Sequence, residues 1–334
     1  MAPSASGKKG KVLPNHMQLN TEKTKTVLVR TSDQEWLTTS LSSGVARRLI
    51  ERKGGDIARA TTVVKFGPDQ TFPPHTHTGG EEFIVLDGHW RDKYGVFPKY
   101  TYIRNFIGSE HAPFIGSDGC KIMVKLCQMH PTGGKPAKEP EHKAWTGLTA
   151  AKVKAEGKQV AEIGGACVYH ELELFSNGLE TVKIMVLPKG QTSIHLPVPK
   201  NGQELFVVDG KMNSSLGEHN VDSWARLTEE KLGKGGKLKV NTSASPCDVY
   251  LWSKEGHLKS KEIDLELARK QELEWIEARK KCAECSDVHY GGKKSMKKSS
   301  MKYEMRRQFP IPFSLICHAE FAIVNPLLPA CRSK

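Results

Sequence analysis

Four side chains around one predicted turn could bind a metal ion. His75 and His77 are two residues apart, so on an extended strand both imidazoles point to the same side. The turn Thr78-Gly79-Gly80 then reverses the chain, and Glu81 begins the returning strand near the imidazoles. His111 comes 30 residues after Glu81, behind a second turn, and leads into another strand-like run. Three neutral imidazoles and one carboxylate that converge inside a barrel would suit a divalent first-row metal ion.

Two kinds of chemistry remain open for such a site. Zinc prefers four ligands, so this set would close a zinc site with a structural or sensing role. Iron(II), manganese or nickel accepts about six ligands, which leaves two positions for a chelating substrate and for dioxygen or water. An ion held by neutral imidazoles and one carboxylate keeps a positive charge, which favours enolate, diketonate or carboxylate ligands.

A simpler interpretation is a set of four polar side chains that hydrogen-bond to one another inside a barrel. An ionised carboxylate buried with several imidazoles would then need other partners, because unpaired buried polar groups are costly. The residue types and their spacing therefore favour a metal ion. The choice of Glu81 over its neighbour Glu82 rests on the interval to Gly88.

The elements around these residues read as short strands. From residue 26 onward, β-rich runs alternate with Gly, Pro, Asp and Asn; examples are residues 26–30, 58–66, 82–86, 100–104 and 121–126. Many short strands at this spacing indicate a β-sandwich or barrel. A content of 30 glycines and 18 prolines suits a turn-rich all-β protein.

The second part of the chain repeats the first. Residues 203–210 resemble residues 81–88 at an offset of 122, and residues 224–226 correspond to 102–104 at the same offset. Similarity that persists at a constant offset predicts two copies of one unit, which we expect to pack face to face.

The second copy lacks the ligand set. The positions that correspond to the ligands hold His195, Pro197 and Gln203, and no histidine occurs in residues 226–236, the segment after Trp224. Proline and glutamine supply neither an imidazole nor a carboxylate, so we expect this copy to act as scaffold or interface. The predicted organisation is a disordered leader at 1–25, a metal-binding unit at 26–129, a linker at 130–144, a degenerate second unit at 145–258, and a charged helix with a basic, disordered tail at 259–334.

The net charge of +13 lies mostly outside the predicted units. Residues 26–258 carry 29 basic and 26 acidic side chains, so the excess belongs to the two ends. The core is therefore not a basic surface, and no nucleic-acid partner is expected from it. A run of about 18 apolar residues is absent, as is the apolar region of a secretory signal, so no membrane partner is expected. The eight cysteines then read as reduced cytoplasmic thiols, with a nuclear location open through the basic tail.

These residues resemble the cupin superfamily. Its first motif has His-x-His, then Glu four residues later, then Gly seven residues beyond, as in His75, His77, Glu81 and Gly88 here, and His111 fits the histidine of the second motif. The stretch 75–88, followed by Trp90, Asp92 and Gly95, is most similar to the ChrR-like cupins, named for the C-terminal domain of a bacterial anti-sigma factor. The resemblance covers 26–129 strongly and 145–258 as a degenerate copy.

The resemblance implies an all-β fold of two tandem cupin barrels (double-stranded β-helix or jelly roll) with a C-terminal helical and disordered extension. Metal-bearing cupins include dioxygenases, isomerases and zinc-dependent sensors. The first hypothesis is therefore an Fe(II)-type oxygenase, with Mn or Ni also open, that acts on a small oxygenated organic anion. The alternative is a zinc-binding, ChrR-like sensor that binds a small ligand without converting it. Sigma-factor control is not implied, because only a polar leader precedes the unit.

Two further residues are candidates for the neighbourhood of the metal. Tyr102 and Arg104 alternate on a predicted strand between the first motif and His111. They could bind an anion and donate hydrogen bonds at the barrel mouth, or they could form an outward salt bridge; both interpretations stay open. The expected partner is a small-molecule ligand or substrate, and a homodimer is a further possibility.

Overall fold

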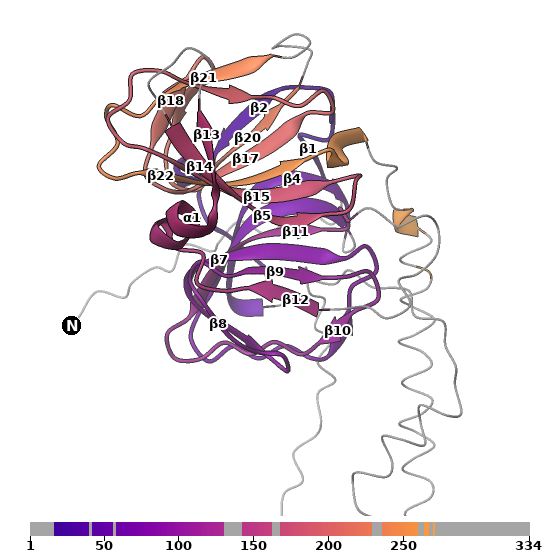
Figure 1. Ribbon diagram of the computed structural model, residues 1–334. Helices are drawn as coiled ribbons and strands as arrows, with labels where there is room; N and C mark the ends of the chain where they lie inside the picture. Colours follow the sequence, from indigo (N-terminus) through magenta and orange to yellow (C-terminus); the bar gives the residue numbers. More distant parts are fainter. Residues whose placement is uncertain are drawn as a thin grey trace, which may run out of the picture.

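The computed structural model describes residues 17–39, 42–55, 58–129, 142–161, 168–228, 236–259, 264–266 and 270. Within these residues the chain is mostly β-structure, and every strand pairing is antiparallel (Figure 1). The all-β jelly-roll class expected from the sequence is confirmed. The predicted charged helix and tail lie almost wholly outside the described residues. Within those residues, no helix combines the length and the apolar character needed to cross a bilayer.

The first large sheet surrounds the predicted metal ligands. Its strands lie in the order β1 (Met17–Leu19), β4 (Ser42–Gly54), β5 (Ala58–Phe66), β11 (Cys120–Leu126), β7 (Glu81–Asp92), β9 (Tyr102–Asn105) and β12 (His142–Trp145). Two further strands join it, β3 (Leu37–Thr39) beside β4 and β8 (Gly95–Pro98) beside β7. A separate two-stranded sheet of β6 (His75–Thr76) and β10 (Glu110–His111) carries two of the histidines.

The second large sheet has an equivalent strand order. It runs β13 (Lys158–Ala161), β14 (Val168–Ser176), β15 (Thr181–Leu187), β22 (Val249–Glu255), β17 (Gln203–Asp209), β20 (Ser223–Leu227) and β2 (Val27–Arg30). A four-stranded sheet of β16 (Ile194–Pro197), β21 (Lys237–Asn241), β18 (Met212–Ser214) and β19 (Gly217–His219) faces it. The short helix α1 (Ala150–Glu156) packs against β14 and β15, and 3-10 turns occur at Thr31–Asp33 and His257–Lys259.

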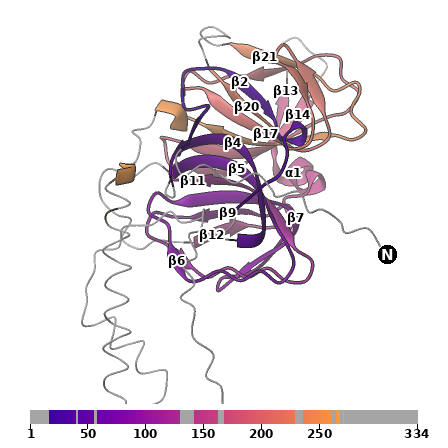
Figure 2. The same ribbon diagram turned by 180° about the vertical axis from the view of Figure 1, so that it is seen from behind.

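The two large sheets exchange their edge strands. β2, from the start of the chain, pairs with β20 in the second sheet, and β12 pairs with β9 in the first (Figures 1 and 2). Two predicted segments are therefore corrected. Residues 17–19, predicted to lie in a disordered leader, form β1 and pair with β4, and residues 142–144, predicted to lie in a linker, belong to β12. Long-range pairing of these short segments overrides their polar composition.

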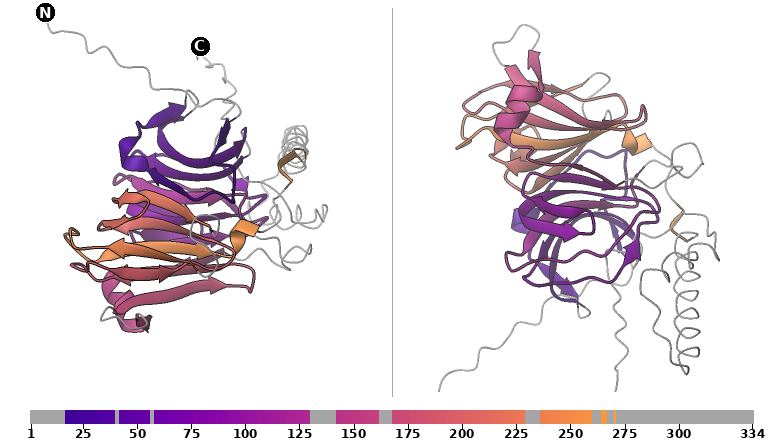
Figure 3. Two further views of the ribbon diagram at one scale, coloured as in Figure 1. Left: turned by 90° about the horizontal axis from the view of Figure 1, so that it is seen from above. Right: turned by 60° about the horizontal axis from the view of Figure 1, so that its bottom comes forward.

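The two large sheets pack against each other across a shared core (Figure 3). Alternate side chains of β7 belong to two different hydrophobic cores. Phe83 and Val85 belong to the core of the first barrel, whereas Ile84 and Leu86 join the core between the sheets. Because successive side chains of a strand point to opposite faces, both faces of β7 are buried.

The core between the sheets also holds paired charges. Each large sheet contributes one lysine, one glutamate and one arginine from three adjacent strands: Lys125, Glu82 and Arg104 from the first, and Lys254, Glu204 and Arg226 from the second. Each lysine pairs with the glutamate of the opposite sheet. Lys125 Nζ lies 2.5 Å from Glu204 Oε2, and Lys254 Nζ contacts Glu82. These pairs therefore link the two sheets.

The glycine of the cupin-like motif is required by the backbone. Gly88 has a φ of +65°, a conformation that side chains with a Cβ rarely adopt. A Cβ at this position would also collide with the carbonyl oxygen of Gly119 on the way into β11. The pairing of β11 with β7 shifts register just before Gly88. Gly88 allows β7 to continue beyond this shift as one strand that begins at Glu81.

Candidate metal centre

The three predicted histidines lie together in the first barrel. His75 on β6 pairs directly with His111 on β10, and the backbone places His77 beside them. One potential ligand atom from each ring lies within 4.8 Å of the others, and Nε2 of His77 is 2.9 Å from Nε2 of His111. All three side chains are buried. The structure therefore contains a histidine triad suited to a metal ion.

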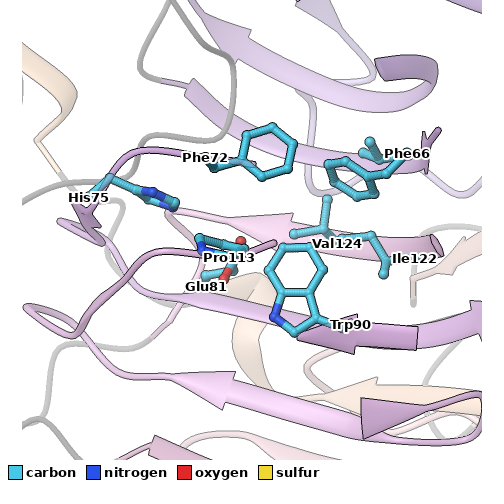
Figure 4. A pocket seen from close by; sticks show the side chains of 9 residues that line it. Phe66, Phe72, His75, Glu81, Trp90, Pro113, Ile122 and Val124 are labelled. Carbon is cyan, nitrogen blue, oxygen red and sulfur yellow. The ribbon is translucent and has the colours of Figure 1, made fainter. Parts of the chain in front are cut away.

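Glu81 completes the predicted set. Its Oε2 lies 3.4 Å from Nε2 of His77 and 3.7 Å from Nε2 of His111. Figure 4 shows Glu81 and His75 lining the same pocket. Glu82, on the opposite face of β7, points into the core between the sheets. Strand alternation thus separates the two glutamates as the interval to Gly88 indicated.

Hydrogen bonds orient two of the rings toward the centre. Nδ1 of His75 lies 3.0 Å from the carbonyl oxygen of Pro73, and Nδ1 of His111 lies 3.0 Å from Asp92 Oδ2. A backbone carbonyl oxygen can only accept a hydrogen bond, and so can an ionised carboxylate. The proton therefore sits on Nδ1 in each ring. The Nε2 lone pairs then face the other ligands, which is the tautomer that a metal ion requires.

Burial acts on the Glu81 carboxyl. It raises the pKa of Glu81, while the neighbouring His111 and a hydrogen bond from Asn105 act in the opposite direction. A divalent cation between the imidazoles and Glu81 would stabilise the carboxylate in this buried place. The donor set, three imidazole nitrogens and one carboxylate, therefore fits the metal ion that the fold implies.

Asp92 has a supporting role that sequence reasoning did not assign. Besides its contact with His111, its carboxylate accepts hydrogen bonds from Trp90 Nε1 at 3.2 Å and from the backbone N–H of Tyr94 at 2.8 Å. Burial opposes ionisation, but these hydrogen bonds outweigh it and hold the pKa of Asp92 below its usual range. Asp92 belongs to the stretch that resembles the ChrR-like cupins, which was the only signal for it.

Asn105 and His142 also lie beside the ligands, and the sequence analysis did not predict either of them. Asn105 Nδ2 donates to Glu81 Oε2 at 2.8 Å, and Asn105 Oδ1 lies 2.9 Å from Nδ1 of His142. Burial lowers the pKa of His142. A lone asparagine at a strand end carries no signal, and His142 lay in the segment assigned to the linker.

Tyr102 and Arg104 lie away from the metal centre, and their proposed role at the barrel mouth is wrong. The Tyr102 hydroxyl donates to Glu82 at 2.5 Å, and Arg104 pairs with Glu82 at 2.9 Å and with Glu180 at 2.5 Å. Arg104 is 1% exposed, so the outward salt bridge is wrong as well. Both side chains share the strand face of Glu82, opposite to Glu81, and are buried between the sheets.

A small apolar cavity adjoins the site. It measures about 20 Å³ and is lined by His75, Glu81 and seven apolar residues: Val64, Phe66, Phe72, Trp90, Pro113, Ile122 and Val124 (Figure 4). A cavity of this size holds about one water molecule. Its lining offers no charged group besides the expected ligand Glu81.

The corresponding positions of the second unit serve other contacts. Gln203 Nε2 donates to Ser253 at 2.8 Å and Pro197 is exposed, while His195 lies on β16. The described part of the chain holds one cluster of three or more potential ligands that could share an ion, which is the triad of His75, His77 and His111.

Replacement of Asp92 by alanine is expected to weaken metal binding about 10- to 100-fold, the usual effect of removing a partner of a ligand. The His111 ring would lose the acceptor that fixes its tautomer. Competition with a chromophoric chelator for zinc or cobalt measures the affinity. Asp118→Ala is the matched control, because Asp118 forms a similar pair with His89 at the surface, away from the ligands. Equal affinities for the two variants would contradict this role of Asp92.

Comparison with known proteins finds a family profile that is similar to the part of the chain that carries the histidine triad. The profile of the ChrR cupin-like domain matches residues 24–130. No curated protein matches the chain significantly. Among solved structures, a candidate glyoxylate-induced protein from Pseudomonas aeruginosa aligns with a TM-score of 0.53 and 11% identity, over 79% of this chain and 100% of that one. A candidate dioxygenase from Nostoc punctiforme aligns with a TM-score of 0.51 and 13% identity, over 71% of this chain and 85% of that one.

At these identities the likeness to solved structures concerns the fold alone. It agrees with the antiparallel strand order of the two large sheets. The profile match, by contrast, covers the segment that carries the four converging side chains and the motif glycine. Residues 24–130 of this chain are therefore similar to the ChrR cupin-like domain.

Proposed function

We propose that the protein binds one divalent metal ion through His75, His77, Glu81 and His111, and that it acts as a metal-dependent oxygenase. The observation that carries the proposal is the convergence of three buried histidines, with Glu81 Oε2 3.4 Å from His77 and 3.7 Å from His111. Hydrogen bonds turn the rings of His75 and His111 so that Nε2 faces the centre. An iron(II)-type ion would supply open coordination positions for dioxygen and a chelating substrate.

The residues of the chain restrict what could react there. The rings of Phe66, Phe72 and Trp90 line the cavity and exclude water from the centre. Since the cavity offers no cationic side chain, an anionic substrate would be drawn by the bound ion alone. The cavity of about 20 Å³ has room for about one water molecule, so an organic substrate would have to displace part of its apolar lining. A small oxygenated organic anion fits these conditions, and the name of the Nostoc punctiforme protein motivates dioxygen as the first co-substrate to test.

Oxygen consumption by the iron-loaded protein tests the proposal. A panel of small carboxylates, diketones and enolisable acids is offered to protein loaded with iron(II) under anaerobic conditions. We expect at least one compound to give oxygen uptake and a new product, and we expect His75→Ala to give neither. The absence of turnover across the whole panel, with iron bound in stoichiometric amount, would count against an oxygenase.

The small cavity also favours a second function. Three histidines and one glutamate would satisfy zinc completely, and such a closed site is typical of structural and sensory metal centres. The protein would then be a zinc-binding, ChrR-like module that binds a ligand without converting it. Stoichiometric zinc in protein purified without a chelating resin, together with no oxygen uptake after exchange to iron, would favour this function over the oxygenase.

A further inference from the structure

A chain of hydrogen bonds runs from Glu81 toward the edge of the first large sheet. Asn105, the last residue of β9, lies between Glu81 Oε2 and Nδ1 of His142, at 2.8 and 2.9 Å. Asn105 is 1% exposed, so water offers no ready replacement for either partner. His142 is the first residue of β12 and pairs directly with Asn105 across the two strands.

The chemistry of the three groups sets the direction of both hydrogen bonds. An ionised carboxylate only accepts, so the amide must turn its NH₂ group toward Glu81. The amide oxygen then faces His142, whose Nδ1 must carry the proton that it donates. Asn105 is therefore held from both sides. The oxygen that it contacts, Oε2, is the same atom that lies 3.4 Å from His77 and 3.7 Å from His111.

The position of His142 is itself well supported. Its ring stacks on Tyr94, with ring centres 4.0 Å apart and planes inclined by 4°. The centre of the Phe97 ring lies 5.5 Å from the centre of the His142 ring. The backbone N–H of Tyr94 donates to Asp92, which in turn orients His111. One turn between β7 and β8 thus supports the partners of two ligands, Glu81 and His111.

We propose that His142 is a positioning residue of the metal centre, which fixes the Asn105 amide and thereby aims the Glu81 carboxylate at the ion. It does so without touching the ion. The inference rests on the proposed metal binding, and it names a residue that follows the matched segment 24–130 in sequence and is brought to the site by β12. His142 is expected to influence metal affinity and ligand geometry under either proposed function.

Two substitutions separate the roles of the His142 ring. His142→Phe keeps a ring that can stack on Tyr94 but removes the donor, whereas His142→Asn keeps an amide donor near the place of Nδ1 and removes the stack. We expect His142→Phe to bind cobalt(II) about 10-fold more weakly, which is the low end of the effect of losing a supporting partner. We also expect it to shift the visible absorption bands of the cobalt protein, and we expect His142→Asn to restore most of both properties.

The matched control is His170→Phe, a half-buried histidine on β14 in the second large sheet. It is expected to leave cobalt affinity and absorption unchanged. If His142→Phe behaves like this control, the inference is overturned. If His142→Asn weakens binding while His142→Phe does not, stacking and not hydrogen bonding is responsible, and the inference is again overturned.

A double variant tests the route through Asn105. Asn105→Leu removes the amide, so adding His142→Phe to it is expected to weaken cobalt binding no further, because the two residues act as one unit. Additive losses would overturn the inference. If His142→Phe folds poorly, Asn105→Leu alone must reproduce the loss of cobalt affinity. Failure of the unaltered protein to bind any ion would overturn the proposed function together with this inference, whereas tight binding with an unchanged His142→Phe overturns only the inference.

Discussion

Replacement of His75 by alanine is expected to lower the affinity for a divalent ion by roughly 100- to 1,000-fold. Zinc sites with four protein ligands bind with about 10–16 kcal/mol, so one ligand of four accounts for about 2.5–4 kcal/mol. His75 is suited to this test because its Nδ1 hydrogen bond goes to a backbone carbonyl, so its removal leaves no carboxylate unpaired. Isothermal titration with zinc, or competition with a chelator, measures the loss.

His195→Ala provides the matched control. His195 occupies the corresponding place on β16 of the second unit, where the described residues form no metal-ligand group. Its replacement is expected to leave metal stoichiometry and affinity unchanged. Equal metal content in the two variants, by elemental analysis of protein purified without a chelating resin, would show that His75 is not a ligand.

Replacement of Lys254 by methionine is expected to lower the free energy of unfolding by about 3–5 kcal/mol, the usual effect of removing one partner of a buried ion pair. Lys254 is fully buried, and its Nζ contacts Glu82 and lies 2.9 Å from Glu180 Oε2. Methionine keeps most of the volume but leaves both carboxylates without this cation. Chemical denaturation followed by tryptophan fluorescence measures the change.

The protonation of these carboxyls depends on their partners. Burial alone would raise the pKa of Glu180, but Lys254 and Arg104 outweigh it and lower the pKa to about 2. A depressed pKa contributes stability that is present above the ordinary glutamate range and is lost as the pH falls through that range toward about 2. The difference in stability between Lys254→Met and the unaltered protein should therefore be largest near neutral pH and should shrink below about pH 4.

Lys154→Met is the control for the ion pair. Lys154 on α1 contacts Asp248, but its side chain is 44% exposed, so the substitution should cost about 1 kcal/mol or less. A similarly small loss for Lys254→Met would contradict the assignment of the charged core as a strong link between the two sheets.

Local sequence patterns predicted the all-β fold class and the histidines that the structure brings together. Alternation along a strand depends only on the backbone, so the spacing of His75 and His77, and the contrast between Glu81 and Glu82, could be derived without the rest of the fold. His111 required more, because a turn and a strand partner had to bring it to His75 from 36 residues away. The resemblance to cupins supplied that information.

Only the tertiary structure decided what surrounds those ligands. Asn105 and His142 come together because β12 pairs with β9, and Arg104 is buried because a second sheet covers its face of the strand. Such contacts depend on the pairing and packing of segments far apart in the chain, which local periodicity does not encode. The sequence, with the resemblance to cupins, therefore predicted the three histidines that come together and Glu81 beside them, whereas the residues that orient them, and the buried charges that join the two sheets, follow from long-range packing.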